Sequence, residues 1–175
     1  MDGSTSMNIA SINQAIFTIV GHSGSGKTTL VEKLLRELIG RELRVATIKH
    51  AHHKVVLDTL GKDSYRYKQA GALMSMLVTS NQLKMVADVI DRREPEQLAQ
   101  RFLGEADLVL AEGFSQCATP KIEVLRRECT KLPRCMVEDG LIAIVTDMCE
   151  VYPQLPHSGL EDISGIAQFM LDYKK

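Results

Sequence analysis

The segment Gly21–Thr28 reads G-H-S-G-S-G-K-T and matches the phosphate-binding loop pattern G-x-x-x-x-G-K-[ST] at every fixed position. Glycines let backbone N–H groups turn toward a phosphate, and the N-terminus of a following helix favours negative charge. We expect the Lys27 ammonium to reach the β- and γ-phosphates and the Thr28 hydroxyl to hold Mg²⁺. The pattern predicts a nucleoside triphosphate site, lined by Gly21, His22, Ser23, Gly24, Ser25, Gly26, Lys27, Thr28 and Thr29.

The residues on either side of this loop predict the elements that must hold it. The apolar run Ala15–Val20 is typical of a buried strand, and Lys27–Ile39 carries apolar residues at helical spacing. Strand, glycine loop and helix is the order that phosphate binding requires. The alternative interpretation is a glycine-rich turn that only begins a helix.

Polar side chains follow several other predicted strands. Ligands of a doubly wound parallel sheet bind beyond the carboxyl ends of its strands, so residues that directly follow an apolar run are candidates for the same site. They are Lys49 and His50 after Leu43–Ile48, Glu112 after Leu108–Ala111, and Thr146 and Asp147 after Leu141–Val145.

Carboxylates among these residues suggest a magnesium site. We expect Glu112 to join Thr28 as a Mg²⁺ ligand, although the acid at such a strand end is usually Asp and the alternative is a solvated carboxylate. Asp58 or Asp63 is expected to hold Mg²⁺ or its water, unless Asp63 only caps a helix. Asp107 begins its strand rather than ending it, and we expect it to be structural.

The Asp147 carboxylate offers a means of choosing the base. It can accept hydrogen bonds from the N1–H and N2–H groups of guanine, which adenine cannot match, so this residue favours GTP. It is also compatible with an ordinary acid at the end of a strand.

Two basic segments leave several interpretations open. The histidines His50, His52 and His53 could bind an anionic substrate together with Lys49, hold a metal, or lie in a plain surface loop. Three arginines could either bind phosphate or remain solvated, namely Arg126, Arg127 and Arg134.

Bulk properties exclude some classes of protein. A net charge of −1 over 175 residues argues against a general nucleic-acid binder, and no apolar run is long enough to span a membrane. The four cysteines lack C-x-x-C spacing, so we expect free thiols and a cytoplasmic protein. We expect an N-terminal extension over residues 1–14 and one nucleotide-binding domain over residues 15–175.

Strands that alternate with helices predict the fold class. The pattern indicates an α/β protein of the P-loop NTPase type, with a mainly parallel sheet flanked by helices and a small antiparallel insertion. The insertion is expected to include Leu73–Val78, Gln82–Val89 and the strand Ile122–Leu125. The remaining helices are expected at Lys62–Ala70, Pro95–Leu103 and Asp162–Tyr173.

Five motifs together resemble one known family. They are G-H-S-G-S-G-K-T-T-L, T-I-K-H-A-H-H, G-K-D-S-Y-R, A-E-G-F and P-K-I-E-V, spread from about Ile16 to about Asp147. This combination is similar to the molybdopterin-guanine dinucleotide biosynthesis adapter family, MobB. The family often carries Lys directly after E-G-F, whereas this chain has Ser115, so an anion contact made by that Lys is either missing here or made by Lys121.

The resemblance implies a homodimeric GTP-binding protein with weak GTPase activity. Such a protein assists the attachment of GMP to molybdopterin and works beside the guanylyltransferase that performs the transfer. Gly21–Thr29 then binds GTP and Mg²⁺, Glu112 is the second metal-side acid, and Lys27, Glu112 and Asp63 are the candidate catalytic residues. The alternative functions are a P-loop kinase that phosphorylates a small molecule, and a module that binds GTP without hydrolysing it.

Overall fold

The computed structural model describes residues 14–51, 55–88, 94–129, 132–148 and 152–174, so most of the expected N-terminal extension lies outside it. The elements, in chain order, are β1 (Ala15–Val20), α1 (Lys27–Gly40), β2 (Val45–Lys49), α2 (Asp63–Gln69), β3 (Met74–Val78), β4 (Leu83–Ala87), α3 (Pro95–Phe102), β5 (Leu108–Glu112), β6 (Lys121–Leu125), the 3₁₀ turn η1 (Val137–Asp139), β7 (Leu141–Thr146), β8 (His157–Ser158) and α4 (Ile163–Tyr173).

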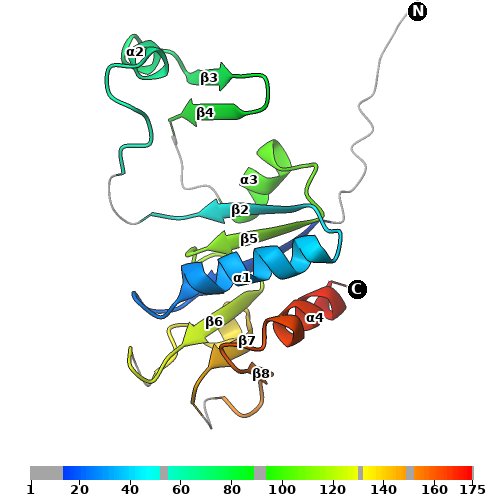
Figure 1. The fold of residues 1–175 in the computed structure, drawn as a ribbon. Coiled ribbons are helices and arrows are strands. Elements are labelled where there is room, and N and C mark those ends of the chain that lie inside the picture. The colour runs from blue at the N-terminus through cyan, green and yellow to red at the C-terminus, as the bar shows by residue number, and fades with distance from the viewer. Residues whose placement is uncertain (1–13, 52–54, 89–93, 130–131, 149–151, 175) are drawn as a thin grey trace, which may run out of the picture. The chain divides into compact units, whose positions relative to one another are not determined.

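The centre of the fold is a six-stranded sheet in the order β2-β5-β1-β6-β7-β8 (Figure 1). Every neighbouring pair in this sheet is parallel, and a separate antiparallel pair is formed by β3 and β4. All five residues of β5 and of β6 are buried, as expected for strands covered on both faces. The predicted α/β P-loop class, with its small antiparallel sheet, is confirmed.

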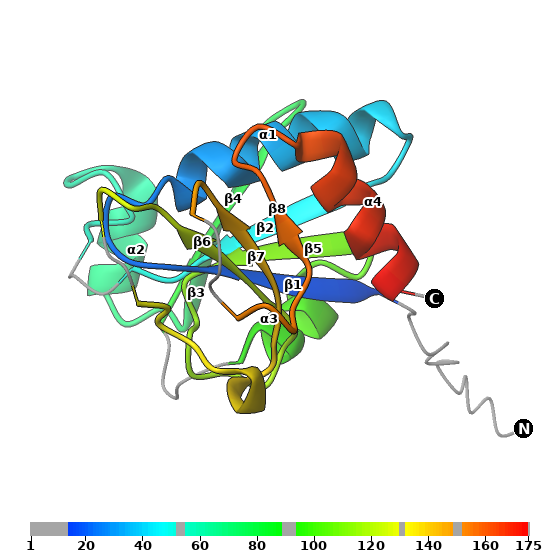
Figure 2. The ribbon, with the colours of Figure 1, turned by 90° about the horizontal axis from the view of Figure 1, so that it is seen from below.

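Helices cover both faces of the large sheet. Helices α1 and α4 lie together on one face, and α3 lies on the other (Figure 2). Alternation along β1 divides its side chains between these layers, because Phe17 and Ile19 pack with the α1 and α4 core whereas Ile16 packs with the α3 core. Leu34 and Leu38 of α1 are fully buried in the first of these cores.

The chain divides into two compact units, one of residues 1–50 and 94–175 and the other of residues 51–93. The smaller unit contains α2 and the β3–β4 hairpin. Within it, the Asp58 carboxylate accepts hydrogen bonds from Ser64 Oγ at 3.0 Å and Lys84 Nζ at 2.8 Å. The expectation of a single domain over residues 15–175 stays a prediction.

Two strands differ from the sequence-based expectation. The strand near Ile122 is not part of an antiparallel insertion, since β6 pairs in parallel with β1 and β7. Its charged residues alternate with apolar ones, a pattern typical of antiparallel strands with one solvated face, but here both faces are covered. The two-residue strand β8 was not predicted, because so short a segment carries no periodicity.

None of the helices in the described part of the chain is long and apolar enough to cross a membrane.

Candidate nucleotide-binding site

The loop between β1 and α1 has a backbone that favours glycine, as its first and last glycines show. A Cβ atom at Gly21 would lie 2.5 Å from the Val124 carbonyl oxygen and 2.8 Å from Ser25 Oγ. Gly26, the residue that precedes α1, has a φ of 94° and no side chain with which to cap the helix. The first turn of α1 therefore begins directly at the loop, in the arrangement that suits phosphate.

The Lys27 side chain folds back along the same loop. Its ammonium donates hydrogen bonds to the carbonyl oxygens of Gly21 at 3.0 Å and His22 at 2.7 Å. Burial lowers the pKa of Lys27 below its usual range, although the Glu112 carboxylate acts in the opposite direction. The cation thus lies inside the loop where the sequence predicted a phosphate ligand.

Thr28 and Glu112 meet at the carboxyl edge of the sheet. The Thr28 hydroxyl lies 3.0 Å from both carboxylate oxygens of Glu112 and donates to them. The Glu112 side chain is only 12% exposed. A hydroxyl and a carboxylate side by side are hard oxygen donors of the kind that Mg²⁺ prefers, so these residues fit the expected metal.

Lys49 and His50 reach the same edge from β2. Lys49 is the register partner of Glu112 in the β2–β5 pair, and its Nζ lies 3.1 Å from Glu112 Oε1. The His50 backbone N–H donates to the Glu112 carbonyl oxygen at 2.9 Å. The His50 ring packs against Phe114, with ring centroids 5.0 Å apart. The parallel register therefore brings these two predicted residues beside Glu112.

Asp147 follows β7 at this edge, as the sequence predicted. Its side chain is exposed, and Oδ1 accepts a hydrogen bond from the Arg127 backbone N–H at 3.0 Å. This contact joins the loop after β7 to the loop after β6. The carboxylate is thereby fixed at the carboxyl end of its strand.

The arginines after β6 differ in their surroundings. The Arg126 guanidinium packs against the loop, 3.5 Å from the position that a Cβ of Gly26 would take. Arg126 Nε is buried without a hydrogen-bond partner among the described atoms. Arg134 is exposed, and its charge acts on Lys27 to lower the lysine pKa. Arg126 thus contacts the phosphate-binding loop.

Glu123 supports this side of the site and was missed by sequence reasoning. It is fully buried on β6 and accepts backbone N–H groups of Arg134 at 2.6 Å and Cys135 at 3.0 Å. Burial raises the pKa of Glu123, although the two backbone N–H groups oppose the shift. The carboxylate ties the loop before β7 to the centre of the sheet. Its only signal in the sequence was a charge inside a short apolar strand.

Lys121 does not serve as the substitute anion contact. Its side chain is fully buried, and Nζ donates to the carbonyl oxygens of Cys117, Thr119 and Asp139. Three carbonyl acceptors use all three N–H donors of an ammonium. Lys121 therefore binds the loop that covers β6, and that expectation was wrong.

Other predicted residues belong to the smaller unit or lie outside the described residues. Asp63 begins α2 in the smaller unit, with its side chain 78% exposed and 3.9 Å from Arg66, so its catalytic role stays a prediction. Asp58 is engaged within that unit, as described above. His52 and His53 lie outside the described residues. No cluster of three or more metal-ligating side chains occurs within the described ranges.

Cys117, Cys129 and Cys135 are free thiols, and Cys149 lies outside the described residues. Burial raises the pKa of the Cys135 thiol to about 11.

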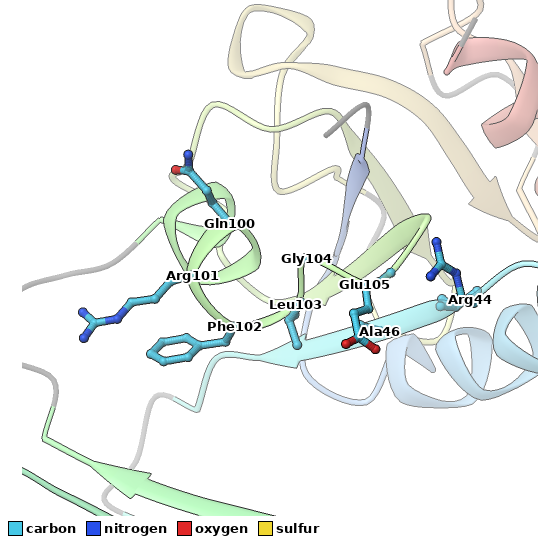
Figure 3. Close-up of a pocket in the computed structure, with 10 residues that line it drawn as sticks. Arg44, Ala46, Gln100, Arg101, Phe102, Leu103, Gly104 and Glu105 are labelled. Atoms are coloured by element: carbon cyan, nitrogen blue, oxygen red, sulfur yellow. The ribbon is translucent and has the colours of Figure 1, made fainter. Parts of the chain in front are cut away.

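A hollow of about 740 Å³ lies away from this site, where β2 and β5 begin and α3 ends. Figure 3 shows Arg44 and Glu105 at one end of it and Arg101 and Phe102 at the other. Arg44 forms an ion pair with Asp107 at 2.7 Å. Because this hollow is at the amino ends of the strands, it is not the site that the phosphate-binding loop predicts.

Comparison with known proteins gives a consistent family. The family model described as "Molybdopterin guanine dinucleotide synthesis protein B" (MobB) matches residues 16–147. The molybdopterin-guanine dinucleotide biosynthesis adapter protein of Haemophilus influenzae is 42% identical over 151 residues, which are 86% of this chain and 82% of that protein. The protein of the same name from Escherichia coli is 31% identical over 154 residues, covering 86% of this chain and 88% of its own length.

Solved structures agree with the sequence relatives. The crystal structure of Bacillus subtilis MobB has a TM-score of 0.71 at 28% identity, covering 90% of this chain and 96% of that chain. A crystal structure of molybdopterin-guanine biosynthesis protein B has a TM-score of 0.70 at 28% identity, covering 90% of this chain and 99% of that chain.

Proposed function

This chain belongs to the molybdopterin guanine dinucleotide synthesis protein B family, and from that premise we propose that it is a GTP-binding adapter with slow GTPase activity. The adapter role in guanine dinucleotide biosynthesis of the molybdenum cofactor is the part that its relatives support directly. We propose in addition that the protein binds GTP and Mg²⁺, hydrolyses GTP and lies in the cytoplasm.

One observation carries the nucleotide part of this proposal. The loop Gly21–Thr28 places the Lys27 ammonium on its own carbonyl oxygens and the Thr28 hydroxyl on the Glu112 carboxylate. A cation, a hydroxyl and a carboxylate around a glycine loop are the groups that hold a nucleoside triphosphate and its metal. Thr28 and Glu112 would hold Mg²⁺, which supplies neutralising charge between the phosphates when bound.

Several residues of this chain would have separate roles in slow GTP hydrolysis. Lys27 would stabilise the negative charge of the transferring phosphoryl group, and the backbone N–H groups of the loop would bind the phosphates. Asp63 or another group of the segment after β2 would orient the attacking water. We expect turnover far below the roughly 1–10³ s⁻¹ that is typical of enzymes.

The proposal also covers recognition of the guanine base and the proteins that this chain would contact. Asp147 would accept hydrogen bonds from guanine N1–H and N2–H, with its position fixed by the Arg127 backbone. The adapter would act beside the guanylyltransferase that attaches GMP to molybdopterin. We also propose a homodimer, supported by the apolar side chains that β3 and β4 leave exposed: Met76, Leu77, Val78 and Leu83.

The test is calorimetric titration of GTP with Mg²⁺ into the wild type, Lys27→Met and Arg36→Met. Lys27→Met should weaken binding about tenfold to 150-fold, the equivalent of a charged hydrogen bond of about 1.5–3 kcal/mol. Arg36 is exposed on α1 and controls for the loss of one positive charge. A Lys27→Met protein that binds GTP as tightly as the wild type would contradict the assignment of Gly21–Thr28 as the nucleotide-binding site.

A further inference from the structure

Lys49 lies between the two side chains that fit a divalent cation. Its Nζ donates a hydrogen bond to Thr28 Oγ1 at 3.2 Å and lies 3.1 Å from Glu112 Oε1. The β2–β5 register, which pairs Lys49 with Glu112, fixes the lysine at this point of the edge. One ammonium therefore bridges the hydroxyl and the carboxylate of the metal-binding pair.

We propose that Lys49 is an internal competitor of the divalent cation: its ammonium must leave the Thr28–Glu112 oxygen pair before a divalent cation can bind there. The inference rests on the proposed function, because it concerns the same metal site. It goes further by giving Lys49 a role as a positioning residue that controls when the metal binds.

The hydrogen bonds explain why the two cations exclude each other. The Thr28 hydroxyl donates its proton to Glu112 and accepts one from Lys49. A metal ion held by this hydroxyl and this carboxylate would lie against the same two oxygens that the ammonium contacts, at about 2.0–2.1 Å for Mg²⁺. Two positive charges so close together also repel each other strongly.

The exposed fractions of the two side chains indicate that Lys49, rather than Glu112, moves. The Lys49 side chain is 60% exposed, whereas the Glu112 side chain is 12% exposed. A long, half-exposed lysine can swing into water at little cost, while the buried strand holds the carboxylate in place. Lys49 can therefore leave the oxygen pair without any change in the sheet.

The neighbouring lysine does not take over this position. The Lys27 ammonium instead donates to the carbonyl oxygens of Gly21 and His22 within the phosphate-binding loop. Lys49 is thus the cation that the described contacts place on the oxygen pair.

The experiment titrates Mn²⁺, followed by electron paramagnetic resonance, into the full chain without nucleotide. Mn²⁺ prefers the same hard oxygen ligands as Mg²⁺. We expect Lys49→Met to bind Mn²⁺ about fivefold more tightly than the wild type, because a partly exposed ion pair no longer has to be broken. Lys49→Arg should restore wild-type affinity, and Arg36→Met should match the wild type.

Two results would overturn the inference. One is Lys49→Met binding Mn²⁺ no more tightly than the wild type; the other is Glu112→Gln binding it as well as the wild type. A parallel calorimetric titration of GTP with Mg²⁺ into the wild type keeps the two proposals apart. Absence of GTP binding would reject the proposed function, whereas an unchanged Mn²⁺ affinity with normal GTP binding would reject only the role of Lys49.

Discussion

Single residues set the chemistry of this protein through contacts that the linear motif only partly indicates. The glycine loop and the acid that ends β5, Glu112, are readable from residue types and spacing. The hydrogen bond from Lys49 to Thr28 cannot be predicted in this way, because it depends on the strand register that places Lys49 beside Glu112. Local sequence does not encode which strand lies next to which, so contacts across strands have to come from the structure.

At this scale Asp147 gives a test of base recognition. Asp147→Asn should weaken GTP binding at least about tenfold, because the carboxylate charge that accepts guanine N1–H and N2–H is lost. The asparagine oxygen can still accept the Arg127 backbone N–H, so the loop should keep its position. Calorimetric titration measures the change, with Glu105→Gln at the opposite edge as the control. Equal GTP affinity in Asp147→Asn and the wild type would show that another group reads the base.

Elements of secondary structure followed from the sequence wherever apolar periodicity was strong. The strand Ala15–Val20 has the predicted bounds, and α1 and α4 differ from prediction by one residue at an end. The strand β6 was assigned to the wrong sheet because Lys121 and Glu123 alternate with Ile122 and Val124. Backbone carbonyl and N–H groups of the covering loop satisfy both charges, and single-strand periodicity cannot reveal such partners.

The beginnings of β2 and β5 are joined by one ion pair that predicts a pH dependence. Arg44 holds the pKa of Asp107 at about 2 through its hydrogen bonds, below the usual carboxyl value. A lowered pKa stabilises the fold above about pH 4, and this stabilisation is lost as pH falls toward 2. Asp107→Asn should therefore lower the free energy of unfolding at pH 7. The difference in this free energy between the variant and the wild type should shrink as the pH falls from about 4 to 2.

Urea unfolding of both proteins at pH 7, 4 and 2.5 measures this dependence. Glu105→Gln, two residues earlier in the chain, should show no comparable trend. A difference between Asp107→Asn and the wild type that is the same at all three pH values would contradict the assignment of the stabilisation to the Asp107 charge.

The whole molecule combines a large unit that contains the phosphate-binding loop with a smaller unit of residues 51–93. The smaller unit leaves Met76 and Val78 of β3 more than half exposed, at 54% and 65%. Adjacent exposed apolar side chains on a short hairpin are typical of a protein–protein contact. This feature supports the proposed homodimer and could not be predicted from composition.

A double substitution tests the homodimer. Met76→Glu with Val78→Glu should convert the protein to a monomer, because two carboxylates would have to be buried in the contact. Sedimentation velocity measures the mass, and Ile39→Glu, on the exposed face of α1, is the matched control. A wild type that sediments as a monomer, or a dimeric double variant, would reject this hairpin as the dimer contact.

Recognition of GTP by the whole protein is the central claim, and one titration tests it most directly. Purified full chain is titrated calorimetrically with GTP and then with ATP, both with Mg²⁺. We predict that GTP binds at least about tenfold more tightly, equivalent to about 1.4 kcal/mol. Equal binding, or tighter binding of ATP, would contradict the assignment of a GTP-binding adapter and favour a P-loop kinase of small molecules.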